Sequence, residues 1–168
     1  MKFWSSIFLV LFLLSGVAGC KIYSFSGANI PPEVKTFSVD LLENRAANAP
    51  ASYNQIFTDQ LKLKLATEAN LKQVQSDGDI QFSGAITSYS VAALAPTAQV
   101  QTGVNRLNIT IQVDFLNTKK ENDKWSKTFS RFAEFPASEI LATRENQMIN
   151  EINKQLIDDV FNAALVNW

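Results

Sequence analysis

Residues 105–116 read Asn-Arg-Leu-Asn-Ile-Thr-Ile-Gln-Val-Asp-Phe-Leu, and their strict alternation decides the fold. Every second residue from Leu107 to Phe115 is apolar, and the residues between them are polar. Successive side chains of a strand point to opposite faces, so the pattern predicts a strand with one face on a core. The other face must meet solvent or a polar partner.

Two further strands flank this segment. Residues 80–91 alternate less cleanly, since Ile80, Phe82 and Ile86 are followed by a pattern that drifts toward Val91. Lys119 to Asp123 form a charged turn, and residues 124–135 read as the returning strand. The three segments predict a sheet of long hairpins.

Two helices are predicted. Residues 53–69 form the first, with Ser52 as a candidate N-cap and Asn70 where a left-handed C-terminal residue often lies. The second begins at Glu145 and runs toward the end of the chain. The apolar stripe of the first helix is Phe57, Leu61 and Leu65, and that of the second is Ile149, Ile152, Leu156, Val160 and Ala163, widened by Phe161, Leu165 and Trp168.

Shorter segments complete the expected order. Residues 22–27, 36–42 and 71–75 read as strands, residues 44–52 as a loop, and Asp77-Gly78 as a turn pair typical of hairpins. The order β-β-α-β-β-β-β-α predicts an α+β two-layer sandwich with two helices on one face. Its sheet should be largely antiparallel or mixed, because the first helix permits a parallel pairing across it.

Composition limits the classes of function. The chain has 168 residues, 46% of them hydrophobic, and a net charge of -1, which fits one folded domain. Nucleic acid is an unsuitable partner because phosphate binding needs a concentrated basic surface. No disordered tract or internal repeat divides the chain.

Catalytic chemistry finds little support. The chain contains no histidine, which removes the commonest general base and most zinc sites. No nucleophile motif or phosphate-binding glycine loop is present. Asp77-Gly78-Asp79 lacks the rest of a calcium-binding loop and reads as a turn. We therefore expect no enzyme activity, no cofactor and no metal.

The first nineteen residues read as a targeting segment. Lys2 precedes the apolar run from Ile7 to Leu14, which is too short to span about 30 Å of hydrocarbon comfortably. Val17-Ala18-Gly19-Cys20 resembles the bacterial lipobox, and Cys20 is the single cysteine. The resemblance implies cleavage after residue 19 and acylation of Cys20, leaving residues 20–168 as one lipid-anchored domain. Lys21 follows, where aspartate would imply inner-membrane retention, so we expect a periplasm-facing protein of the outer membrane.

Two surfaces could carry function. Residues 80–105 contain no charged side chain, which indicates either a partner surface or a partly buried hairpin end. On the last strand, Trp125, Lys127, Phe129 and Arg131 share a face, which could bind an anionic amphiphile. Alternatively, this is an edge strand whose long basic side chains cover the rim of the core.

Seven segments of the chain have a familiar order and spacing: residues 20–27, 30–33, 36–39, 84–91, 105–107, 128–132 and 164–168. Together they resemble the LptE-like lipopolysaccharide-assembly lipoproteins of the outer membrane. The resemblance covers the whole chain after residue 19 and contains no catalytic motif.

This resemblance implies a two-helix sandwich that sits as a plug inside the LptD-type outer-membrane β-barrel and helps to assemble it. The pair would place lipopolysaccharide in the outer leaflet, with direct contact to lipopolysaccharide. From charge placement we select Arg106, Lys127 and Arg131 as candidate ligands for it. The alternative is a periplasm-facing lipoprotein that activates a cell-wall-synthesising enzyme, which would predict a long linker after Cys20 where residues 22–25 read as structure.

Overall fold

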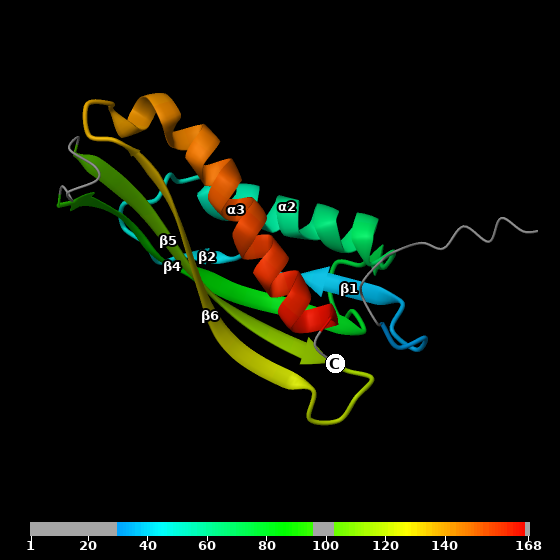
Figure 1. Ribbon diagram of the computed structural model, residues 1–168. Coiled ribbons are helices and arrows are strands. Elements are labelled where there is room, and N and C mark those ends of the chain that lie inside the picture. Colours follow the sequence, from blue (N-terminus) through cyan, green and yellow to red (C-terminus); the bar gives the residue numbers. More distant parts are fainter. Residues whose placement is uncertain (1–29, 96–102, 167–168) are drawn as a thin grey trace, which may run out of the picture.

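A curved sheet covered on one face by two helices forms the protein (Figure 1). The computed structural model describes residues 30–95 and 103–166. The elements in chain order are β1 (Thr36–Val39), β2 (Glu43–Asn44), α2 (Tyr53–Glu68), β3 (Lys72–Gln73), β4 (Ile80–Leu94), β5 (Val104–Asn117), β6 (Lys124–Pro136) and α3 (Leu141–Leu165). The predicted α+β two-layer sandwich is confirmed.

The sheet is mixed. Its order is β3-β1-β4-β5-β6, and β2 pairs with a later part of β4. The long strands β4, β5 and β6 form an antiparallel meander, in which β5 pairs with both neighbours along its length. The short strands β1, β2 and β3 join in parallel. The parallel pairing predicted across the first helix is therefore present.

The core lies between the helices and the apolar face of the meander. Leu107, Ile109 and Ile111 of β5 are fully buried, as the alternation predicts. The helices contribute the stripes read from the sequence, although Ala164 is buried where Ala163 is only half-buried. Among the described residues, no helix has the length and apolar character needed to cross a membrane.

The drift of the pattern in β4 has a local cause. The pairing register with β5 shifts between Ile86 and Ser88, so Thr87 is an extra residue in the strand. Before this bulge even-numbered residues such as Ile86 face the core, and after it Tyr89 does. The bulge therefore keeps β4 amphipathic while the phase of its sequence changes.

The structure corrects several details of the sequence prediction. Asp77-Gly78 does not form a hairpin, because β3 and β4 lie on opposite sides of β1. The Ser52 side chain makes no capping hydrogen bond, and α3 begins at Leu141, four residues before Glu145. Strand β2 was not predicted. The predicted strand 22–27 and Trp168 lie outside the described residues.

A buried polar group joins the two helices. The Tyr53 hydroxyl donates to Asn153 Oδ1 at 2.6 Å, and Asn153 Nδ2 donates to Gln60 Oε1 at 2.9 Å. Tyr53 and Asn153 are both completely buried, and burial raises the pKa of the Tyr53 phenol. The group fixes one lateral register of α2 against α3, since a shift would leave these atoms unsatisfied.

Replacing Tyr53 with phenylalanine is expected to lower the free energy of unfolding by about 1 kcal/mol. The ring stays packed, but Asn153 Oδ1 loses its donor inside the core. Urea denaturation followed by circular dichroism measures the change. Unchanged stability would mean that water or another donor reaches Asn153.

Candidate functional site

The face of the meander opposite the helices is open and polar. In the middle of β4, β5 and β6 it carries hydroxyl and amide side chains, which form cross-strand rows. Thr110 Oγ1 and Ser130 Oγ are 3.0 Å apart, and Gln112 Nε2 donates to Ser126 Oγ at 3.1 Å. These four side chains are hydrogen-bonded to one another and carry no charge, and they leave a polar surface on the open face.

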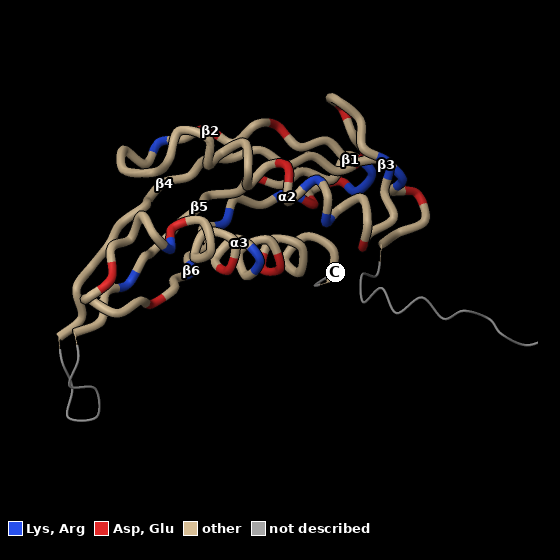
Figure 2. Tube along the Cα trace, turned by 90° about the horizontal axis from the view of Figure 1, so that it is seen from above, with Lys and Arg blue, Asp and Glu red and all other residues tan. Residues whose placement is uncertain are grey.

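The far end of this surface is the start of the β4–β5 hairpin. All of β4 lacks charge, and its trace is uniformly tan in Figure 2. Ala92 is exposed on the open face, while Val91, which is 46% exposed, and Ala93 are exposed on the face of the helices, where Val91 pairs with Leu107. The described part of the charge-free segment is therefore accessible at this end, while residues 96–102 lie outside the described residues.

The three candidate cations do not lie together. Arg106 is on the open face, because its register partners are Ala92 and Glu134. Lys127 and Arg131 are on the opposite face, where their register partners are the buried Val113 and Ile109. A single anionic group cannot contact all three through one face of the sheet.

Two of these cations already bind carboxylates. Arg106 Nη2 lies 2.5 Å from Glu134 Oε1. Arg131 donates through Nε and Nη2 to both carboxylate oxygens of Asp159 in α3, at 2.6 and 2.7 Å. This bond raises the pKa of the Arg131 guanidinium further. Arg131 therefore fastens α3 to β6.

Lys127 belongs to an aromatic group at the edge of the core. Its ammonium lies 4.9 Å from the centroid of the Trp125 ring, which stacks on Phe115. Phe129 packs edge-on against Trp125. Trp125 and Phe129 are half-buried against the core. This arrangement fits the alternative in which the side chains of an edge strand cover the rim of the core.

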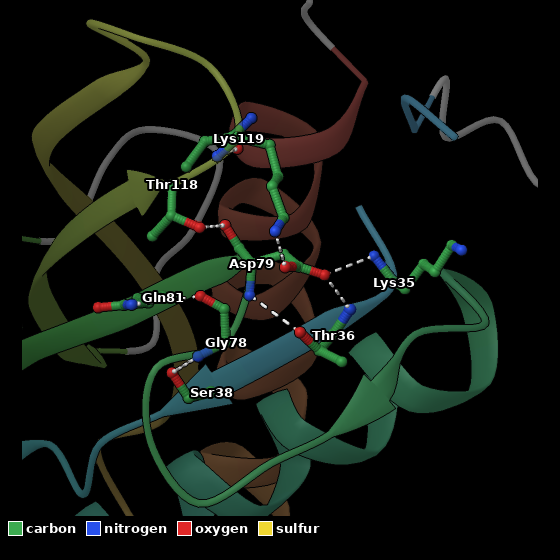
Figure 3. Close-up of polar contacts among 9 residues, drawn as sticks. Lys35, Thr36, Ser38, Gly78, Asp79, Gln81, Thr118 and Lys119 are labelled. Carbon is green, nitrogen blue, oxygen red and sulfur yellow. Dashed lines mark hydrogen bonds and ion pairs between the residues drawn. The ribbon is translucent and has the colours of Figure 1, made fainter. Parts of the chain in front are cut away.

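A second polar cluster lies where the described chain enters the sheet (Figure 3). The Asp79 carboxylate accepts hydrogen bonds from the backbone N–H groups of Lys35 and Thr36, both at 2.9 Å, and pairs with Lys119 Nζ at 2.9 Å. The Asp79 backbone carbonyl accepts two further bonds from Thr118. One residue thus ties together β1, β4 and the turn after β5.

The ion pair with Lys119 and these backbone donors hold the pKa of the Asp79 carboxyl well below its usual range. Its oxygens are occupied by protein donors, so the cluster is a structural clamp. Sequence reasoning placed Asp79 in a turn and missed this role. The missing information was the position of Lys35 and Thr36, more than forty residues earlier.

The fold and this surface define a class: a two-layer α+β domain whose long antiparallel meander leaves one polar face uncovered. A family model identifies one family within that class. Residues 34–164 match the family model LptE, described as lipopolysaccharide-assembly, so the chain belongs to the LptE family. No curated protein matches the chain by sequence.

The chain is similar to several solved structures. A hypothetical protein from Chlamydia trachomatis has a TM-score of 0.53 at 8% identity, covering 80% of this chain and 99% of that one. A protein from Xanthomonas campestris has a TM-score of 0.50 at 7% identity, covering 81% and 86%. Lipoprotein B from Nitrosomonas europaea has a TM-score of 0.49 at 10% identity, covering 76% and 79%. The first two likenesses extend to the fold alone.

Proposed function

We propose that the protein is an outer-membrane lipoprotein that sits as a plug inside an LptD-type β-barrel and assists lipopolysaccharide transport to the outer leaflet. Residues 1–19 are removed as a signal peptide, and acylated Cys20 holds residues 20–168 at the membrane, facing the periplasm. The role is one of assembly and binding, without catalysis. Membership of the lipopolysaccharide-assembly family supports this function.

The open polar face of the meander is the observation that carries the proposal. Large outer-membrane barrels enclose a polar, hydrated interior. A plug in such a lumen needs a compact core together with hydroxyl and amide side chains on its surface. The uncovered rows of Ser, Thr, Gln and Asn on β4, β5 and β6 meet this requirement.

The distance between the end of the domain nearest Cys20 and the β4–β5 hairpin also suits a tethered plug. The chain leads from Cys20 into β1, which the Asp79 clamp holds near the end of β5 at Asn117. The β4–β5 hairpin lies at the other end of the 14-residue strand β5, about 45 Å away at roughly 3.3 Å per residue. Hydrocarbon is about 30 Å thick. A domain anchored in the inner leaflet could therefore carry its hairpin to the level of the outer leaflet.

Contact with lipopolysaccharide is part of this proposal. Lys127 has no carboxylate partner among the described residues and is exposed, so its ammonium is available to a phosphate. Arg106 and Arg131 could contact a phosphate only by giving up Glu134 or Asp159. We therefore rank Lys127 first among the three candidate ligands.

Affinity purification of the tagged, full-length lipoprotein from detergent-solubilised outer membranes tests the function. We expect a large β-barrel protein to be recovered in equal molar amount and to survive washing. An untagged strain controls for background. Recovery of a cell-wall synthase in place of a barrel, or of no partner by the folded lipoprotein, would overturn the plug assignment.

A further inference from the structure

An exposed aromatic ring lies on the open face of the sheet, near the hairpin end. Phe132 of β6 is 46% exposed and pairs in register with Asn108, which pairs in turn with Ser90. The next row toward the hairpin holds Arg106 and Glu134. We call these five residues the Phe132 patch. A single exposed ring is common on protein surfaces, so the case for a ligand depends on the polar groups beside Phe132.

The patch carries no net charge. The Arg106 guanidinium stacks over the Phe132 ring at 3.9 Å from its centroid and donates through Nε and Nη2 to the same oxygen of Glu134, Oε1. A phosphate approaching Arg106 would meet the Glu134 carboxylate beside it. The electrostatics of the patch therefore favour an uncharged ligand over an anion.

Several polar groups of the patch remain open to a ligand. Within the part of the chain that the structure describes, Glu134 Oε2, Arg106 Nη1 and the side chains of Asn108 and Ser90 have no hydrogen-bond partner. Asn108 and Ser90 lie in one row with Phe132 across β5 and β4, and Arg106 and Glu134 lie in the next row, so a ligand would meet all of them on one face of the sheet. The set offers both donors and acceptors beside an apolar surface.

We propose that the Phe132 patch binds an uncharged pyranose saccharide. The C–H face of a sugar ring would lie against the part of Phe132 that Arg106 leaves exposed, while its hydroxyls would donate to Glu134 Oε2 and exchange hydrogen bonds with Asn108 and Ser90. The source of the sugar, which is the saccharide of lipopolysaccharide, rests on the proposed function. It assigns Arg106 to sugar binding through the pair with Glu134, in place of phosphate binding.

The two-residue period of β6 could have revealed this patch. It places Ser130, Phe132 and Glu134 on one face, opposite the face of Trp125 and Phe129. The sequence reading followed the aromatic and basic residues of the other face and left Phe132 out of its candidate ligands.

Isothermal titration calorimetry on the full-length lipoprotein in detergent tests the proposal. The first probe is a neutral hexose oligosaccharide released from lipopolysaccharide and free of phosphate and carboxylate groups, and the second is a β-1,4-linked N-acetylglucosamine oligomer. We expect the first probe to bind. Phe132→Leu should raise its Kd about tenfold, which corresponds to the loss of one aromatic contact. Glu134→Gln should weaken it as well. Leu116→Ala removes another exposed apolar side chain from the same face and should leave the affinity for the saccharide unchanged.

The outcomes separate this inference from the plug function. Absence of binding by both probes, or equal affinity of Phe132→Leu and the unaltered protein, overturns the saccharide site. Binding of the N-acetylglucosamine oligomer alone supports the site but moves its source to the cell wall. Because the patch is one part of the open face, Phe132→Leu should still recover the barrel in the affinity purification, and loss of the barrel by this variant would overturn the saccharide site and assign Phe132 to the barrel interface. Failure of the unaltered protein to recover a barrel, with saccharide binding intact, would count against the plug function alone.

Discussion

Replacing Gly78 with alanine is expected to lower the free energy of unfolding by about 3 kcal/mol, through overpacking against backbone that cannot move aside. At Gly78 the chain crosses the face of β1 on its way from β3 to β4. A Cβ atom built there would lie 2.5 Å from the backbone nitrogen of Ser38 and 2.6 Å from the carbonyl carbon of Phe37. Neither neighbour is a flexible side-chain end.

Gly103→Ala is the matched control. A Cβ atom at Gly103 would meet only the Ala137 Cβ, at 3.2 Å, so we expect a loss below about 1 kcal/mol. Urea denaturation of the full-length variants in detergent, followed by circular dichroism, gives both values. If Gly78→Ala were as stable as Gly103→Ala, the crossing over β1 would have to be looser than the structure describes.

The same crossing marks the limit of what sequence could predict. Strict alternation in residues 105–116 and four-residue spacing in α2 were sufficient for the meander, the helices and the layer arrangement. Strands β1 and β3 lie within the predicted strands 36–42 and 71–75, and only the two-residue strand β2 was missed. Periodicity reports burial on one face, so it could not show which strands these short segments pair with. Asp77-Gly78 looks locally like a hairpin turn. Its real role depends on β1, forty residues earlier along the chain.

The candidate site was predictable to a similar extent. Alternation correctly identified a polar face and placed Arg106 on it. It could not reveal that Arg106 meets Glu134 and that Arg131 meets Asp159, because each pair is separated by 28 residues and depends on strand register or helix docking. Whether a cation is free or neutralised decides whether it suits a phosphate or a sugar. That distinction requires the tertiary structure.

Replacing Asp79 with asparagine is expected to lower the free energy of unfolding by about 2 kcal/mol at pH 7, because charge-assisted bonds to two backbone N–H groups and the pair with Lys119 are lost. The effect should depend on pH. The folded-state pKa of Asp79 is lowered, so its contribution is present above the unfolded-state value of about 3.9 and declines as pH falls below it. We therefore expect the difference between the two proteins to narrow by about 1 kcal/mol at pH 3.

Asp114→Asn provides the control for this pH dependence, since Asp114 is an exposed carboxylate on the open face that has no ion pair among the described residues. Denaturation midpoints at a series of pH values from 7 to 3 compare the three proteins. The denaturation midpoint of Asp114→Asn should match that of the unaltered chain at every pH. The midpoint of Asp79→Asn should approach that of the unaltered chain only at acid pH. A constant difference at all pH values would show that the carboxylate charge contributes nothing and that shape alone holds β1 in place. A difference that narrows would show that the charged Asp79 clamp holds β1 and the segment before it against the sheet that bears the proposed binding surface.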